Sequence, residues 1–174
     1  RPNHHTFSGL SAAEAVLNRQ QKESGTVLLD IGAGTTNIIV IEDGEVQYVS
    51  VLPIGGIHIT NDLAIGLKTD LDIAEAVKPK HGSLDSKMHS GNVSVDLGNE
   101  THSFSSEDVH MIIEARVEEL FEYVDKELKK IQRSRKLPGG AVLVGGTSKL
   151  PGIADFAKEK LQLPARLGKI QDMT

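Results

Sequence analysis

Glycines, hydroxyls and one carboxylate gather in a single stretch, LLDIGAGTTNIIV at residues 28–40. Its apolar run leads into Asp30. The glycine-rich turn that follows contains Gly32, Ala33, Gly34, Thr35 and Thr36. Glycines let backbone N–H groups approach an anion closely, and threonine hydroxyls add further donors. A carboxylate repels phosphate but suits a hydrated Mg²⁺, so Asp30 is a candidate for the metal site. The pattern predicts a phosphate-binding hairpin, and the alternative is a tight hairpin with a solvated Asp.

A second glycine-rich turn lies near the C-terminus, in VLVGGTSKLPGI at 142–153. Here a hydrophobic run ends in Gly145 and Gly146, and a helix is expected from about Pro151. Glycines at the carboxyl end of a strand let a phosphate or a flat ring lie against the backbone. Gly145, Gly146 and Thr147 are therefore candidate ligand contacts. Two glycines are weak evidence, and an ordinary strand-to-helix turn is the alternative.

The third candidate is AEAVKPKHG at 74–82, where Glu75 and Lys78 are three residues apart. That spacing places both side chains on one face of a helix. Together they can hydrogen-bond a ribose and a ring. A solvated surface ion pair is the alternative interpretation.

The elements that position these motifs follow from apolar patterning. Three runs, TVLLDI (26–31), TNIIVIE (36–42) and EVQYVSVL (45–52), predict an antiparallel meander, with Asp-Gly between the last two as a hairpin turn. A helix over SAAEAVLNRQQKES is expected before them, ending at Gly25. After them, we expect a buried strand over AVLVGG, a helix over GIADFAKEKLQL and an edge strand over ARLG.

An inserted block separates the two halves of that unit. Helices are expected at roughly 59–68 and 70–78, the second capped by Thr69 and stopped by Pro79. VSVDL and THSF then predict a small hairpin around Gly98-Asn99. Apolar residues at spacings of three and four predict one long amphipathic helix over 107–133: Val109, Ile112, Ile113, Val117, Leu120, Val124, Leu128 and Ile131. The sequence thus predicts an α/β core (1–56 and 139–174) with an inserted subdomain (57–138).

Composition excludes several classes of function. The 174 residues contain no Cys, so disulfide and thiolate chemistry are absent. The seven His lack the spacing of a helical ligand pair, and we expect no zinc site. The net charge of −5 argues against nucleic acid as a partner. No run reaches the length of a membrane helix and no secretory signal is visible, so we expect a cytoplasmic protein. Because the first residue is not Met, we also expect a fragment of a longer protein.

In this order, the three motifs resemble the second domain of the actin-like (ribonuclease H-like) ATPase superfamily. The DIGAGTTN stretch looks like its second phosphate motif, VLVGGTSKLPGI like its adenosine motif, and the E-x-x-K pair like its adenosine-contacting helix. The resemblance is narrower still to the FtsA family of bacterial cell division proteins, over about residues 10–170. Four stretches carry it: QKESGTVLLDIGAGTTNIIV, VLPIGGIHITNDLAIGL, AEAVKPKHG and PARLG. PilM-like adaptors of type IV pilus assembly and sugar-kinase-like enzymes of the same fold are the alternatives.

The resemblance implies ATP and Mg²⁺ as cofactors. Asp30 would lie near the metal, Gly32 to Thr36 would cradle the phosphates, Gly145 to Thr147 would face the adenosine phosphates and ring, and Glu75 and Lys78 would reach ribose and base. Turnover would be slow at most, and Glu14 is the one catalytic candidate. Because the other half of the cleft belongs to another domain, we expect the isolated chain to bind ATP weakly or not at all.

The resemblance also implies partners. FtsA polymerises and tethers FtsZ filaments to the inner face of the cell membrane at the division site, through a membrane segment that this sequence lacks. Its site for the FtsZ C-terminal tail includes an Arg on the long helix, which IIEAR matches at Arg116. An Arg suits an acidic peptide tail. The alternative is a surface ion pair of Arg116 with Glu114 or Glu119.

Overall fold

A twisted meander of three strands forms one side of the sheet in the computed structural model, which describes residues 16–85 and 89–168. Its strands are β1 (Thr26–Ile31), β2 (Thr36–Glu42) and β3 (Glu45–Leu52). Both pairings are antiparallel, as predicted, with Asp30 opposite Asn37. Asp43 and Gly44 both have positive φ, as the two-residue hairpin turn between β2 and β3 requires.

The other side of the sheet is parallel. The strand β6 (Ala141–Val144) pairs with β1, and β7 (Ala165–Leu167) extends the sheet as an edge, giving the order β3-β2-β1-β6-β7. Between β6 and β7 come a short 3-10 turn, η2 (Gly146–Lys149), and the helix α6 (Ile153–Leu161). The predicted strand, helix and edge strand are confirmed, and this mixed sheet is the α/β core.

The segment before β1 differs from the single helix predicted over residues 11–24. Within its described part the helix α2 covers only Arg19–Ser24, and Asn18 starts it with a capping box. The Asn18 side chain accepts from the Gln21 N–H at 2.7 Å. Asn favours the cap over the helix interior, because its side chain competes for backbone donors.

The inserted block leaves the sheet after β3 and contains two helices, α3 (Gly56–Gly66) and α4 (Leu71–His81). Both differ from the predicted bounds. The helix α3 starts three residues earlier, and α4 is preceded by Asp70 rather than capped by Thr69. Pro79 does not stop α4 but lies in its last turn, where only one backbone bond depends on its missing N–H.

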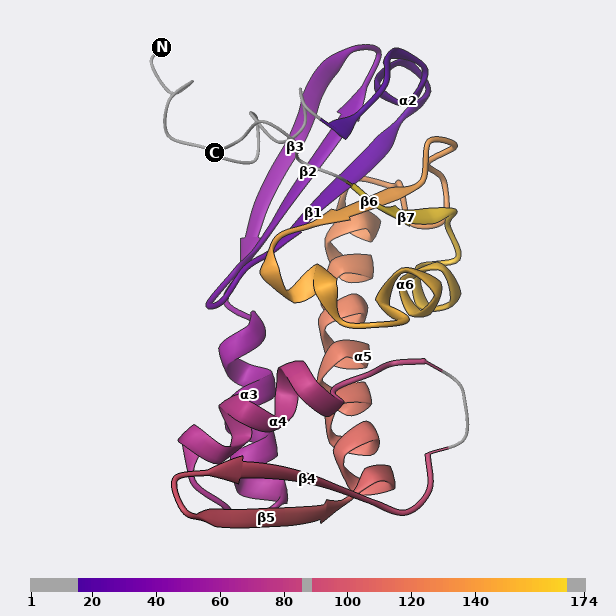
Figure 1. Cartoon of the computed structure of the whole chain (residues 1–174). Coiled ribbons are helices and arrows are strands. Elements are labelled where there is room, and N and C mark those ends of the chain that lie inside the picture. The colour runs from indigo at the N-terminus through magenta and orange to yellow at the C-terminus, as the bar shows by residue number, and fades with distance from the viewer. Residues whose placement is uncertain (1–15, 86–88, 169–174) are drawn as a thin grey trace.

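A hairpin and one long helix complete the insertion. The strands β4 (Asn92–Leu97) and β5 (Glu100–Ser105) pair as predicted, and α5 (Ser106–Lys130) follows. In Figure 1, α5 runs from this hairpin at one end of the molecule to the sheet at the other. A single element therefore links the insertion to the core.

The main core lies between one face of the sheet and the helices. The predicted stripe of α5 faces it: Val109, Ile113, Val117, Leu120, Val124 and Leu128 are buried, while Ile112 and Ile131 are partly buried. A smaller cluster covers the opposite face of the sheet, where Val16 and Leu17 pack on residues of β1, β2 and β6. Within the described residues, no helix is long and apolar enough to cross a membrane.

Candidate functional site

The turn between β1 and β2 presents backbone at the edge of the core. Its ends are closed by the Gly32 N–H, which donates to the Thr35 carbonyl at 2.9 Å. Ala33, Gly34 and Thr35 are exposed. A Cβ on Gly34 would meet nothing within 4 Å, so the space beside this backbone is open. The turn is thus free to receive a ligand along its outer side.

Thr36 behaves differently from its neighbours in the turn. It is fully buried, and its hydroxyl donates to the Ile54 carbonyl at 2.8 Å. This bond ties the start of β2 to the chain that leaves β3. The Thr36 hydroxyl therefore stabilises the hairpin, and the exposed donors of the motif are those of the turn itself.

The N-terminus of α3 fixes the back of the same turn. The Gly56 N–H donates to the Gly32 carbonyl at 2.9 Å, and the Ile57 N–H donates to the Ala33 carbonyl at 2.7 Å. A side chain on Gly55 would clash, since its Cβ would lie 2.6 Å from the Gly32 carbonyl oxygen. The Gly55-Gly56 pair thus permits a close backbone contact, a role that the sequence interpretation missed although the double glycine was visible.

Asp30 lies at the end of β1, directly behind the turn. It is partly buried, and among the described residues its carboxylate has no hydrogen bond or ion pair. Burial raises the pKa of the Asp30 carboxyl above its ordinary value. A desolvated carboxylate without a partner is stabilised by a nearby cation.

The second glycine motif lies against the first. Gly145 has φ of 95°, and a Cβ there would lie 2.6 Å from the Asp30 Oδ1. The Thr147 hydroxyl donates to the Gly32 carbonyl at 3.1 Å. Gly146 is exposed, with nothing within 4 Å of an added Cβ. The parallel pairing of β1 and β6 explains this meeting, because the carboxyl ends of parallel strands share one edge of a sheet.

The insertion closes the site from the opposite side. On α4, the Lys78 Nζ donates to the Gly56 carbonyl at 3.1 Å, so this side chain reaches the start of α3. Glu75 is exposed one turn earlier, and its carboxylate makes no hydrogen bond or ion pair within the described part of the chain. Both residues line the same pocket as Ala33 and Gly146.

Together these elements enclose a pocket of about 570 Å³, a size common for small-molecule sites. Five predicted residues line it: Ala33, Glu75, Lys78, Gly146 and Thr147. Sequence reasoning missed the other lining residues: Gly56, Ile57, Pro79, Gly82, Lys149, Leu150 and Pro151. Pro79 and Gly82 follow Glu75 at i+4 and i+7, so extending the Glu75–Lys78 spacing by one turn would have found them.

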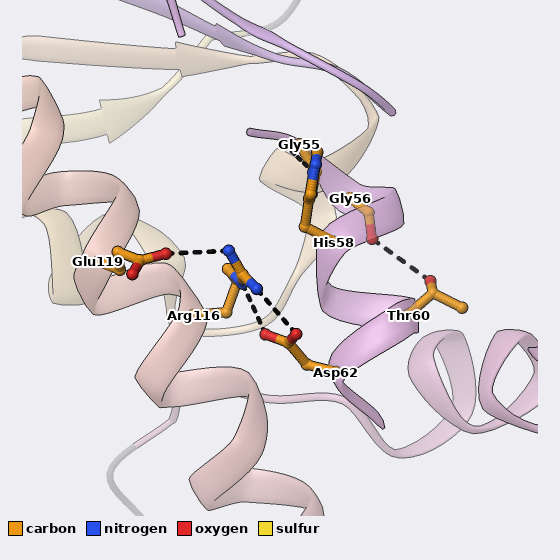
Figure 2. A network of polar contacts seen from close by, with 7 residues as sticks. All are labelled: Gly55, Gly56, His58, Thr60, Asp62, Arg116 and Glu119. Carbon is orange, nitrogen blue, oxygen red and sulfur yellow. Dashed lines mark hydrogen bonds and ion pairs between the residues drawn. The ribbon is translucent and has the colours of Figure 1, made fainter. Parts of the chain in front are cut away.

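Arg116 lies outside this pocket, between α3 and α5. Figure 2 shows its guanidinium against Asp62, with Nε donating to one carboxylate oxygen at 2.6 Å and an Nη to the other at 2.8 Å. A third bond goes to Glu119 at 2.9 Å. These partners raise the pKa of Arg116, the Asp62 bond most of all. The guanidinium is therefore paired within the chain, with Glu119 as expected but chiefly with Asp62.

Two other predictions concern metal and catalysis. Glu14 lies outside the described residues. Among those described, no group of three or more His, Asp or Glu is arranged to hold a metal ion.

A second hollow of about 540 Å³ lies between α5 and α6, and most of the residues that line it are acidic: Asp85, Glu114, Glu118, Asp155 and Glu159.

Comparison with known proteins gives a consistent relationship. The model of the family described as "Cell division protein FtsA" matches residues 27–174. The FtsA of Bacillus subtilis is 39% identical over 162 residues, covering 91% of this chain and 37% of that protein. The FtsA of Neisseria meningitidis is 39% identical over 169 residues, covering 94% and 41%. The chain thus spans about two fifths of the length of these relatives.

Solved structures share the fold at lower identity. MreB5 of Spiroplasma citri bound to ADP superimposes with a TM-score of 0.74 at 20% identity, covering 91% of this chain and 53% of that one. A PilM-PilN type IV pilus biogenesis complex gives 0.67 at 24% identity, covering 93% and 40%. A MamK double helical filament gives 0.65 at 23% identity, covering 83% and 49%. The actin-like fold predicted from the sequence is confirmed.

Proposed function

Because this chain belongs to the FtsA family of cell division proteins, we propose that it forms one wall of an ATP site in an actin-like adaptor. That adaptor polymerises and links FtsZ filaments to the membrane at the division site. The observation that supports this most is the pocket, because three motifs far apart in the sequence contribute to its lining. Convergent polar groups in a mostly apolar cavity are typical of ligand sites.

Within this proposal the glycine turns hold the phosphates. The open space beside Gly34 and Gly146 fits a group that approaches the backbone. The turn from Ala33 to Thr35 offers N–H donors and the Thr35 hydroxyl, whereas the Gly32 N–H is already bonded to the Thr35 carbonyl. Gly145 and Thr147 hold the second turn against the first, and the Thr36 hydroxyl supports the hairpin from behind. Glu75 and Lys78 would orient the ribose and base.

Asp30 fits the metal role because it is a partly buried carboxylate whose charge no described residue balances. Mg²⁺, when bound with ATP, would neutralise phosphate charge and assist attack by water. Asp30 would orient the water shell of the ion rather than contact a phosphate. The chain's own contribution to any turnover is therefore binding and orientation.

The proposal includes weak affinity for the isolated chain, since the pocket supplies one wall of a cleft between two domains. Calorimetry of the chain with Mg²⁺ and ATP tests this point. We expect heats that do not saturate below millimolar nucleotide. A micromolar dissociation constant would show that the pocket is sufficient alone, contrary to the proposal.

The FtsZ tail would bind at Arg116, where an acidic peptide would compete with Asp62 for the guanidinium. A fluorescent FtsZ C-terminal peptide provides the test, with a peptide from a PilM-type pilus partner as the control. We expect binding to the first peptide only, weakened by Arg116→Ala. Tight binding to the pilus peptide alone would instead favour the pilus adaptor.

A further inference from the structure

The start of α3 lies against the first glycine turn and has no room for an ordinary capping residue. Gly55 precedes the helix, and a Cβ added to it would lie 2.6 Å from the Gly32 carbonyl oxygen. The side chains that ordinarily cap a helix start, those of Ser, Thr, Asp and Asn, are therefore excluded at this position. A side-chain cap has to come from inside the helix instead.

His58, the third residue of α3, supplies that cap. Its Nδ1 accepts from the Gly55 N–H at 3.0 Å, and the His58 N–H donates to the Gly55 carbonyl at 3.1 Å. Figure 2 shows the His58 ring directed at Gly55. In a capping box this position is ordinarily Glu or Gln, whose side chain reaches back to the N–H before the helix. Histidine thus takes the acceptor role of a capping box here.

The acceptor nitrogen of His58 exists only in the neutral ring. When Nδ1 accepts, the ring proton is on Nε2, and protonation of Nδ1 turns the acceptor into a donor. Two N–H groups then face each other across 3.0 Å, and the Gly55 N–H loses its partner. Because imidazole is the side chain that changes charge between about pH 5 and 8, acidification through this range removes the cap.

Charged groups lie around the turn and the start of α3, and none of the described ones is paired with His58: Asp30, Asp62, Glu75, Lys78, Arg116 and Lys149. Asp62 follows His58 at i+4 on the same helix face, but Arg116 occupies its carboxylate at 2.6 and 2.8 Å and also bonds Glu119. The N-terminal end of a helix also disfavours a cation. The fold therefore offers a protonated His58 ring no carboxylate in exchange for the lost cap.

The first residues of α3 hold the phosphate turn in place. The Gly56 N–H and the Ile57 N–H donate to two carbonyls of that turn at 2.9 and 2.7 Å, and both residues line the pocket. We propose that neutral His58 is a positioning residue for the nucleotide site, and that its protonation weakens nucleotide binding by releasing the start of α3 from the turn. This inference rests on the proposed function, since it concerns the regulation of the same site.

Two substitutions separate the acceptor from the charge. His58→Gln keeps a side-chain acceptor at the third helix position but cannot be protonated, and His58→Ala removes the acceptor at every pH. His102→Gln on β5 is the matched control, since it removes a partly exposed imidazole that does not line the pocket. Circular dichroism at each pH verifies the fold of all four chains.

The cap is tested first without nucleotide. Long-range proton–nitrogen NMR of the labelled full chain reports which ring nitrogen carries the proton. We expect the Nε2–H form of His58 at about pH 8. As the ring is protonated, the Gly55, Gly56 and Ile57 amide shifts should change, and this change should be lost in His58→Gln. A His58 ring with its proton on Nδ1 at about pH 8 would overturn the inference at this step.

ATP then tests the consequence for the site. Ligand-observed NMR of each chain with Mg²⁺ and millimolar ATP gives the affinity at about pH 8 and at about pH 5. Comparison with His58→Gln cancels the protonation of ATP itself, which is the same for every chain. On acidification, we expect the unaltered chain and His102→Gln to lose about three- to fivefold more affinity than His58→Gln, within the range for one neutral hydrogen bond. His58→Ala should bind weakly at both pH values.

The outcomes separate this inference from the proposed function. If the unaltered chain binds ATP and loses no more affinity on acidification than His58→Gln, the inference fails while the nucleotide site stands. Tighter binding by the unaltered chain on acidification, relative to His58→Gln, would also overturn the inference, because the His58 charge would then attract phosphate directly. If no chain responds to ATP at millimolar concentration, the proposed site and the inference both fail.

Discussion

Two carboxylates, Glu127 and Asp30, differ in the hydrogen bonds that surround them. Glu127 on α5 is buried and accepts three hydrogen bonds: from the Tyr48 hydroxyl at 2.6 Å, the Ser50 hydroxyl at 2.7 Å and the Lys130 Nζ at 2.7 Å. These donors, Lys130 first, lower the pKa of Glu127 to about 2. Asp30 has no such donor among the described residues, and burial raises its pKa.

The difference supports the proposed metal role of Asp30, whereas the charge of Glu127 is satisfied within the fold. At the contact of α5 with β3, the fold surrounds the carboxylate with donors, as buried charges require. At the end of β1, beside the two glycine turns, it leaves the charge unbalanced. Groups that violate such local rules concentrate at functional sites.

The largest expected effect comes from removing the satisfied carboxylate. Glu127→Ala leaves the Tyr48 and Ser50 hydroxyls without their acceptor, and we expect the free energy of unfolding to fall by about 2 kcal/mol. Urea denaturation measures it. Glu122→Ala, an exposed position on the same helix, is the control and should change stability by less than about 0.5 kcal/mol. Equal losses of stability in the two variants would contradict a structural role for Glu127.

The pH dependence of stability tests the hydrogen-bond partners of Glu127 in a second way. Because folding lowers the pKa of Glu127 from 4.5 to about 2, its contribution is complete above pH 4.5 and is lost as pH falls toward 2. We therefore expect Glu127→Gln to lose less stability than the unaltered chain over this window. Thermal melts across the acid range measure the difference, and parallel curves would contradict the assigned partners.

A smaller loss of stability is expected near the middle of α5. Arg116 pairs with Asp62 at a site where both side chains are about one quarter exposed. We expect Arg116→Ala to lower the free energy of unfolding by about 1 kcal/mol, less at high salt because the pair is screened. A double-mutant cycle with Asp62→Ala isolates the coupling. A coupling that is zero at low salt would show that this pair does not hold α3 to α5.

The smallest expected change is a gain in stability, for a substitution of Asp30. Asp30→Asn removes a desolvated charge, so we expect a gain in unfolding free energy of less than about 1 kcal/mol at neutral pH. Because the folded pKa is raised, the penalty exists above that pKa and disappears on acidification, so the gain should shrink at low pH. Denaturation at two pH values checks this. A loss of stability would mean that Asp30 is satisfied after all.

Local sequence patterns predicted most of the secondary structure. The three meander strands match their predicted bounds, because short apolar runs and the Asp-Gly turn are encoded within a few residues. The buried stripe of α5 follows from its period. Contacts between distant segments were not predictable in this way. The Asp62–Arg116 and Tyr48–Glu127 pairs join residues more than fifty positions apart, and no local pattern specifies them.

The site shows the same division. Spacing grouped Glu75 with Lys78, strand ends suggested the two glycine turns, and residues of all three segments line one pocket. The helix stop predicted at Pro79 is wrong, because the effect of a missing N–H depends on its position in the helix. In the last turn of α4 that loss affects one carbonyl only, and the helix continues.

Backbone amide chemical shifts of the labelled full chain, titrated with Mg²⁺ and ATP, test whether nucleotide binds in the proposed pocket. We expect shifts at millimolar nucleotide in the turn Gly32–Thr35, at Gly56, in the α4 face with Glu75 and Lys78, and at Gly146–Thr147. Asp30→Asn should reduce the additional shifts that Mg²⁺ causes. Unchanged amides at these positions, with responses at the acidic hollow between α5 and α6, would contradict it.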